Sequence, residues 1–430
     1  MKKIILYFLF GLLLTTSLNI QAASKDKETY EYLDLFGKIF DHVRSQYVDN
    51  VTDEELIEKA IDGMLTGLDP HSSYMDEEEW KDMQMDTKGK FGGLGIEITM
   101  EEGFIKVISP IEDTPAYKAG ILAGDFIIQI DDTPVFGLTL GEAVDLMRGN
   151  KGEPILITVS RDGKDPFEIK IIRDIIKIQS VKYEIFDNIG YLRITSFTEQ
   201  TESGLIKSIK SIKEIQKNKQ LGFILDLRSN PGGLLSQSVK VTDLFLEKGE
   251  IVSTRGRNNN DIQRYLAKKN DLIQKQPLVV LINGGSASAS EIVAGALQDH
   301  KRAIIIGTKS FGKGSVQTII PFKKSNPEKS MAGIRLTTAR YYTPSGISIQ
   351  GKGIVPDIII EQGVFESKEF KRFSESDLKD SLDSEKNKEI ENETNTNEEK
   401  SRLEKDYQLA RAIDLIKGIG IYEQSLLENK

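Results

Sequence analysis

The stretch LVVLINGGSASASE, residues 278–291, decides the fold of the central part of this 430-residue chain. Its five apolar residues, Leu278 to Ile282, are typical of a strand buried on both faces. A turn of small residues follows, and from Ser288 the pattern becomes helical. A strand, a tight turn and a helix in this order indicate one unit of an α/β sheet.

The same alternation extends on both sides of this stretch, from Ile178 to about Ile360. Strands are predicted at 189–194, 222–227, 278–282 and 303–307, and helices at 199–217, 234–246 and 288–300. Such alternation predicts βαβ units in a largely parallel sheet, and hence a mixed α/β domain.

Residues 92–174 have a different pattern: short runs of alternating apolar and polar residues, typical of strands, are separated by Gly and Asp turns. Strands are predicted at 96–99, 104–107, 126–130 and 155–160, and short helices at 115–119 and 140–147. This size and order predict a compact domain of six strands and two helices.

Both ends of the chain are predicted to be helical. One apolar stripe near the N-terminus contains Phe36, Ile39, Phe40, Val43 and Tyr47. Thr52 and Glu55 have capping-box spacing, which predicts a second helix ending near Asp69 and Pro70. Leu409, Ile413 and Ile416 predict a last amphipathic helix, closed by Gly418 and Gly420 and docked on the core or on another subunit. Before it, residues 374–406 contain no aromatic residue and are rich in Glu, Lys, Ser and Asn, which predicts a flexible linker.

The first 23 residues have the layout of a secretory signal peptide: Lys2 and Lys3, an apolar run from Ile4 to about Leu14, and Ala22-Ala23 at the exit. An uncleaved membrane anchor is the alternative, although the run is shorter than the roughly 20 residues that span a bilayer. We therefore expect an exported, periplasmic protein, with association with the outer face of the inner membrane left open.

Composition excludes several classes of function. The formal charge of −9 argues against binding to nucleic-acid backbones, and the loss of Lys2 and Lys3 with the signal would make the charge more negative still. Because the chain has no cysteine, it cannot form disulfides, and it can supply neither a thiol nucleophile nor a cysteine ligand to a metal. Polypeptides are the expected partners, and neither a metal nor an organic cofactor is expected.

Ser288 is a candidate nucleophile because it stands where a helix begins and backbone N–H groups are unpaired. The partial positive charge of a helix N-terminus favours an alkoxide and an anionic intermediate. The alternative is a helix cap, since Ser288 and Glu291 also have capping-box spacing.

A serine nucleophile needs a base, and the three histidines, His42, His71 and His300, are poor candidates. His300 lies near the far end of the helix that starts at Ser288, about 18 Å away by the helical rise. Lys313 stands between two glycines in SFGKGSVQ, residues 310–317, and desolvation lets a lysine accept a serine proton. Gln317 could hold its amine. A phosphate-binding loop is the alternative, but Gly314 replaces the Ser or Thr that such a loop requires.

A third motif, LDLRSNPGGL at 225–234, joins a buried strand to a helix through two glycines. It could offer an N–H to an oxyanion, although by itself it is an ordinary strand-to-helix turn.

With these motifs the chain resembles the C-terminal processing peptidases, or tail-specific proteases, from residue 30 to 365 and in the last helix. The resemblance is carried by LDPHSSY at 68–74, GLGI at 93–96, residues 226–234, SASASE at 286–291, GKGSVQ at 312–317 and YYTPSG at 341–346. It implies a mixed α/β core similar to the crotonase superfamily, with an inserted PDZ domain and an N-terminal helical segment. It also implies a Ser288/Lys313 dyad, with Gln317 orienting the lysine and the N–H groups of Gly233 and Ala289 forming the oxyanion hole.

The PDZ resemblance implies that the loop of Gly93, Leu94, Gly95 and Ile96 binds the carboxylate of an apolar substrate tail. A plain turn into a strand is the alternative. Arg148 matches a position that links PDZ domain and core in some relatives. A catalytically inert PDZ scaffold or chaperone, and a crotonase-like acyl-CoA enzyme, are the alternative functions. An adaptor protein and a homo-oligomer are possible partners.

We expect a signal peptide at 1–23, a helical segment at 28–88, the PDZ domain at 89–175, the protease core at 176–366, a charged linker at 367–402 and the C-terminal helix at 403–430.

Overall fold

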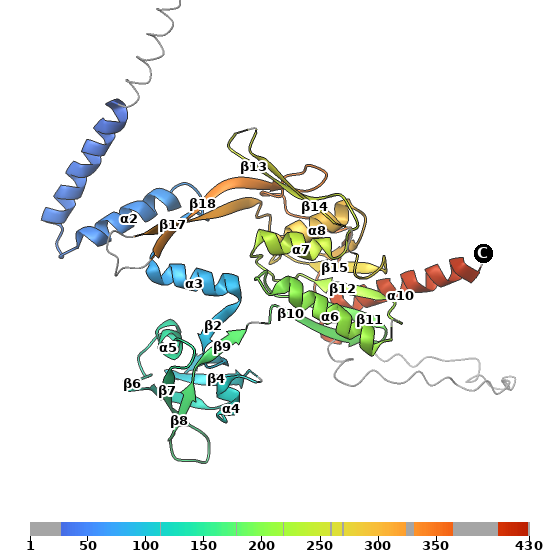
Figure 1. The fold of residues 1–430 in the computed structure, drawn as a ribbon, viewed down its shortest axis with the longest axis horizontal. Helices are drawn as coiled ribbons and strands as arrows, with labels where there is room; N and C mark the ends of the chain where they lie inside the picture. The colour runs from blue at the N-terminus through green and yellow to red at the C-terminus, as the bar shows by residue number, and fades with distance from the viewer. Residues whose placement is uncertain are drawn as a thin grey trace, which may run out of the picture. The chain divides into compact units, whose positions relative to one another are not determined.

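The computed structural model describes residues 27–363 and 403–428, apart from 112, 178, 218, 259, 269, 270 and 324–330 (Figure 1). The expected signal peptide and charged linker therefore lie outside the described residues. The chain divides into two compact units, Met1–Glu77 with Gln317–Thr337 and Glu78–Val316 with Thr338–Lys430. No helix of the described part is both long enough and apolar enough to span a bilayer.

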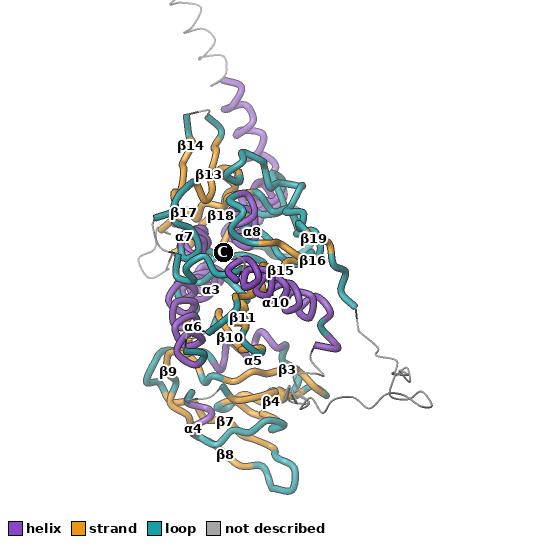
Figure 2. Tube along the Cα trace, turned by 90° about the vertical axis from the view of Figure 1, so that its right-hand side faces the viewer, coloured by secondary structure: helices purple, strands orange, loops and turns teal. Residues whose placement is uncertain are grey.

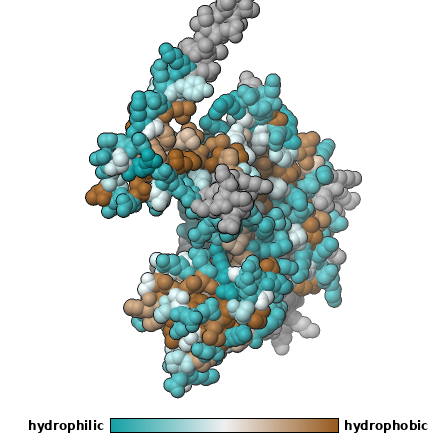
Figure 3. Space-filling view, turned by 60° about the vertical axis from the view of Figure 1, so that its left-hand side comes forward, coloured by the Kyte–Doolittle hydropathy of each residue, from teal (hydrophilic) through white to brown (hydrophobic). Residues whose placement is uncertain are grey.

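The first unit begins with two helices, over residues 27–46 and α2 (Asp53–Thr66). The predicted capping box starts α2, where Glu55 Oε2 accepts the N–H of Thr52 at 2.9 Å. The apolar stripe of the first helix is exposed, with Phe36 at 46% and Ile39 at 55% of full accessibility; Figure 3 shows apolar residues in brown on this part of the chain. Strand β1 (Ser73–Met75) pairs with β18 (Met331–Tyr342).

The second unit opens with α3 (Glu77–Lys88) and then the predicted six-stranded domain. Its sheet has the order β3-β4-β5-β7-β8, with β6 beside β5. The bounds are β3 (Ile96–Glu101), β4 (Phe104–Pro110), β5 (Phe126–Ile130), β6 (Thr133–Pro134), β7 (Pro154–Ser160), β8 (Phe167–Ile172), α4 (Pro115–Lys118) and α5 (Leu140–Met147). The chain enters and leaves this domain through the antiparallel pair β2 (Lys90–Gly93) and β9 (Asp174–Lys177).

The predicted α/β core is confirmed. A six-stranded sheet has the order β10-β11-β12-β15-β16-β19, parallel from β11 to β19. Its elements are β10 (Val181–Phe186), β11 (Ile189–Ile194), α6 (Thr201–Ile215), β12 (Gly222–Asp226), α7 (Leu235–Asp243), β15 (Leu278–Ile282), α8 (Ala289–Asp299), β16 (Ile304–Gly307) and β19 (Ile358–Ile359).

Each face of this sheet has its own helical cover (Figure 2). Leu225 and Val280 point to a core shared with α6, α7 and α8. Ile224 and Val279, one position earlier on their strands, point to a core shared with α10 (Tyr407–Glu428). Leu409, Ile413 and Ile416 are all buried there, so the last helix docks on its own chain.

The predicted end of that helix is wrong, because α10 runs through Gly418 and Gly420 to Glu428. A glycine inside a helix costs only about 1 kcal/mol relative to alanine, and helix formers follow both glycines. The prediction also missed a second sheet, built from β1, β13 (Glu250–Gly256), β14 (Ile262–Leu266), β17 (Ser315–Lys323) and β18. Two of its strand pairs are local, β13 with β14 and β17 with β18, but the pairing of β18 with β13 and with β1 joins distant segments and leaves no local pattern.

Candidate active site

Ser288 lies at the sharp turn between the buried strand β15 and helix α8. Its backbone has φ 53° and ψ −110°, which is rare for a residue with a side chain. Holding such a conformation costs about 1–3 kcal/mol and is typical of functional turns, including the strand-to-helix turns that present nucleophiles. Ser288 is 8% exposed, and it also forms the capping box with Glu291. The cap and the candidate nucleophile are therefore the same residue.

The glycine pair at 232–233 lies directly against this turn. A Cβ on Gly232 would stand 2.9 Å from Ser288 Cβ and 3.0 Å from the Ala289 nitrogen. A Cβ on Gly233 would stand 2.3 Å from the carbonyl oxygen of Phe197. Both glycines have positive φ, at 105° and 137°, so no other residue fits either position. The structure thus brings the loop of Gly233 beside Ser288 and Ala289.

Asn230, which sequence reasoning did not single out, holds this loop in place. Its side chain donates to the Ile194 carbonyl and accepts from the Gly232 N–H, both at 2.9 Å. Its own carbonyl accepts from the Ala287 N–H and the Ser290 hydroxyl, both at 3.0 Å. Asn230 is fully buried. The glycine loop and the serine turn are therefore bonded together on both sides of Ser288.

The segment of Lys313 approaches the same turn from β16. Glu291 accepts the N–H of Gly312 at 2.7 Å and that of Lys313 at 2.9 Å. Gly314 is required because its Cβ would lie 2.3 Å from the backbone nitrogen of Gln350. Strand β17 begins at Ser315, so no helix follows the lysine. This excludes the alternative that Lys313 belongs to a phosphate-binding loop, because such a loop needs a helix N-terminus.

Gln317 belongs to the first unit, where its amide donates to Thr337 Oγ1 at 3.2 Å. Thr337 in turn donates to Asp69 Oδ1 at 3.1 Å. Burial raises the pKa of Asp69, but bonds from Ser72, His71 and Thr337 outweigh it and hold this pKa below its ordinary value. Asp69 therefore closes its own loop and also fixes Thr337, the hydrogen-bond partner of Gln317.

The histidines take other places. His300 ends α8, and its Nε2 lies 2.7 Å from the carbonyl oxygen of Glu250. His71 follows Asp69 in the closed turn, where its N–H donates to that carboxylate at 2.8 Å. His42 lies exposed on the first helix. The contact of His71 is that of a residue in a structural turn.

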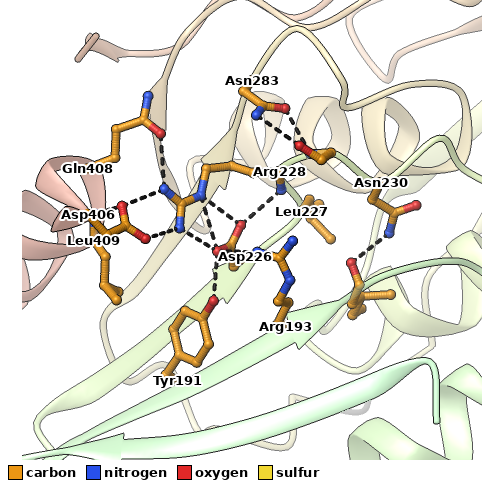
Figure 4. A network of polar contacts seen from close by, with 12 residues as sticks. Tyr191, Arg193, Asp226, Leu227, Arg228, Asn230, Asn283, Asp406, Gln408 and Leu409 are labelled. Carbon is orange, nitrogen blue, oxygen red and sulfur yellow. Dashed lines mark hydrogen bonds and ion pairs between the residues drawn. The ribbon is translucent and has the colours of Figure 1, made fainter. Parts of the chain in front are cut away.

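Arg228 starts the glycine loop and connects it to the C-terminal helix (Figure 4). Its guanidinium bonds to Asp226 and Asp406, each with a contact of 2.7 Å, and to Gln408 at 3.1 Å. Burial disfavours the charged form, but these carboxylates outweigh it and raise the pKa of Arg228; Arg228 likewise lowers the pKa of Asp406. We call the contact between Arg228 and Asp406 the C-terminal latch. Sequence reasoning missed it because the two residues are 178 positions apart.

The predicted tail-binding loop lies between β2 and β3. Leu94 is buried, and Gly95 has φ 80° with its Cα facing Thr114, whose Cβ would be 2.4 Å from an added Cβ. The loop carbonyls of Leu94 and Gly95 accept from Ala116 and Ile111 at 3.0 and 2.9 Å. Strand β3 is at the end of its sheet, where a peptide can add as a further strand.

Arg148 ends α5 and contacts α3 rather than the α/β core. Its Nη1 donates to Asp82 at 2.5 Å, and its guanidinium lies 5.8 Å from the Phe91 ring centroid. Its buried Nε has no hydrogen-bond partner among the described residues.

Comparison with known proteins finds matches to three parts of the chain. The profile of peptidase family S41 matches residues 188–360, that of PDZ domains 106–161, and that of the activating protease CtpB N-terminal domain 13–79. A carboxy-terminal-processing protease of Bartonella bacilliformis is 59% identical over 368 residues, which cover 84% of this chain and 83% of the relative. The carboxy-terminal processing protease CtpA of Bacillus subtilis is 37% identical, covering 76% and 69%. The solved structure of a photosystem II D1 C-terminal processing protease is 29% identical, covers 76% and 92%, and has a TM-score of 0.44.

Proposed function

The chain belongs to peptidase family S41, and from this premise we propose that Ser288 is its nucleophile and Lys313 its general base. It is a serine peptidase of the carboxy-terminal processing class and carries a PDZ domain. Its substrates are proteins. The observation that carries the assignment is the meeting of three loops, those of Ser288, Gly233 and Lys313, through buried and partly buried hydrogen bonds.

In the proposed reaction, the neutral amine of Lys313 takes the proton of the Ser288 hydroxyl while Oγ bonds to the scissile carbonyl carbon. The carbonyl oxygen becomes an anion that accepts from the N–H groups of Gly233 and Ala289. Collapse of this intermediate breaks the C–N bond, and the Lys313 ammonium returns the proton to the leaving amine. A water then gives a proton to Lys313 and adds to the acyl-enzyme carbonyl. When this second intermediate collapses, the bond between the carbonyl carbon and Ser288 Oγ breaks, and the Lys313 ammonium returns the proton to Oγ.

Three further roles complete the proposal. Gln317 orients the Lys313 amine, and its bond to Thr337 supports this by restricting the amide. The loop from Gly93 to Ile96 binds the terminal carboxylate of the substrate, while the tail extends the sheet along β3. Arg148 transmits tail binding from the PDZ domain toward the core, and its cluster with Asp82 and Phe91 is the supporting contact.

The domain limits and location are part of the proposal. We assign a signal peptide to 1–23, helices to 28–88, the PDZ domain to 89–175, the protease core to 176–366, a linker to 367–402 and a helix to 403–430. The signal layout supports export to the periplasm, at the outer face of the inner membrane.

The test is cleavage of an unstructured protein with an apolar C-terminal tail. We expect Ser288→Ala and Lys313→Ala each to lower the rate by about a thousandfold or more, since nucleophile and base act as a unit. Tail binding should persist in both variants. If the wild type binds but never cleaves, the chain is an inert scaffold; if Ser288→Ala cleaves normally, the dyad is wrong.

A further inference from the structure

Glu291 is a fully buried carboxylate that accepts four hydrogen bonds. Its Oε2 accepts the N–H groups of Ser288 at 2.8 Å and of Lys313 at 2.9 Å. Its Oε1 accepts the N–H of Gly312 at 2.7 Å and the hydroxyl of Ser310 at 2.6 Å. One oxygen is thus bonded to both residues of the proposed dyad.

A helix cap does not account for these contacts. A capping box needs only the bond between Glu291 and Ser288, at the start of its own helix. The other three donors come from residues 310–313, which follow Glu291 by 19 to 22 positions. They belong to the loop between β16 and β17, and they reach across to α8.

Burial of a carboxylate is costly unless hydrogen bonds compensate it. Here four donors surround the charge, and Glu291 also sits in the first turn of α8, where the helix dipole favours a negative group. A charged acceptor forms stronger bonds than a neutral one, so this carboxylate fixes the two loops more firmly than an amide would.

We propose that Glu291 is a positioning residue that sets the separation of Ser288 and Lys313. This inference rests on the proposed dyad. The two catalytic groups come from different loops, and the strained turn at Ser288 would relax without an external hold. Glu291 bonds the backbone of each residue, so their side chains start from a constant distance.

Glu291→Gln tests this with almost no change in shape. An amide has only one acceptor oxygen, so half of the four donors lose their acceptor. Misplacement of catalytic groups by about 1 Å costs on the order of a hundredfold, and we expect kcat to fall by about that factor with KM little changed. The rate at which a fluorophosphonate labels Ser288 should fall in parallel, because it depends on the same dyad.

The matched control is Asp271→Asn. Asp271 is another carboxylate in a turn, with a side chain 5% exposed, and it pairs with Arg302 and accepts the N–H groups of Ile273 at 3.1 Å and Lys275 at 2.8 Å. It lies outside the proposed site. This variant should lose thermal stability but keep its kcat.

The outcomes separate the inference from the proposed function. If Ser288→Ala and Lys313→Ala are inactive while Glu291→Gln and Glu291→Asp keep full kcat, the positioning role is wrong and the dyad stands. If Glu291→Gln loses no more activity than the unfolded fraction explains, or if neither Glu291 variant folds, Glu291 holds the fold only and the proposal is overturned. If Ser288→Ala retains activity, the dyad itself fails.

Discussion

Two glycine loops of this protein are assigned to negatively charged oxygens, and they are built differently. The loop at 228–234 packs against rigid atoms: Asn230 is fully buried, and Cβ atoms added at Gly232 and Gly233 would meet the backbone or Cβ of neighbouring elements, although Gly233 itself is exposed. The loop at 93–96 is buried from Gly93 to Gly95, leads into an edge strand, and has the side chain of Thr114 as its close neighbour. An oxyanion exists only in the transition state and needs fixed donors, whereas a substrate tail needs a site that peptides can enter.

The largest effect is expected at the loop at 228–234, from Gly232→Ala. The new Cβ would clash with the Ala287 carbonyl at 2.8 Å and with Ser288 Cβ at 2.9 Å, at a φ of 105°. We expect kcat to fall by about a thousandfold, through lost transition-state donors and a displaced serine.

Gly163→Ala is the control for backbone strain alone. Gly163 has φ 74° but no atom within 4 Å of an added Cβ. The Gly163→Ala variant should lose only about 1–3 kcal/mol in its free energy of unfolding, measured by thermal unfolding. If Gly232→Ala keeps more than a tenth of wild-type activity, the close packing of Gly232 against the Ser288 turn does not matter for catalysis.

The C-terminal latch offers a smaller effect, on the stability of the loop at 228–234. Asp406→Asn leaves the buried charge of Arg228 with one carboxylate fewer, which should cost about 3 kcal/mol. Asp414→Asn, which breaks only an exposed pair with Arg411, should stay within about 0.5 kcal/mol. Urea unfolding measures both, and equal losses would show that the latch contributes nothing special.

The latch also predicts a direction for pH dependence. Arg228 lowers the pKa of Asp406 in the folded state. The latch therefore stabilises the folded protein fully at pH values above the pKa of Asp406 in the unfolded chain, about 3.9. This stabilisation is lost as the pH falls through the pKa of Asp406 in the folded state. Wild type should therefore lose more stability below about pH 4 than Asp406→Asn. Parallel pH curves for the two proteins would contradict this.

The smallest effect on activity is expected at the loop at 93–96, from Gly95→Ala. A Cβ there would stand 2.4 Å from the Cβ of Thr114, at a φ of 80°, so the backbone of this loop must move. We expect the Kd for an apolar tail peptide to rise about tenfold, by loss of well-placed N–H donors. Gly137→Ala, at φ 95° with no atom within 4 Å, is the control. If labelling of Ser288 slows more than peptide binding weakens, this loop does not serve tail binding.

The sequence correctly predicted elements whose ends are marked by turn residues. β5, α5, β11 and β15 begin and end at the predicted residues, because apolar runs there stop at glycine, aspartate or asparagine turns. It also predicted the burial of Leu409, Ile413 and Ile416. It missed the sheet of β13, β14, β17 and β18, in which the pairing of β13 with β18 joins segments far apart in the chain and leaves no local pattern.

The sequence by itself determined the order of the elements and the residue types able to supply a nucleophile, a base and glycine-borne N–H donors. Only the tertiary structure decided which polar groups hold them. The sequence pattern indicated only a helix cap for Glu291, and no pattern near Arg228 or Asp406 predicted their contact. The physical reason is that a hydrogen bond is set by distance in space, and folding brings together residues whose separation along the chain carries no information about it.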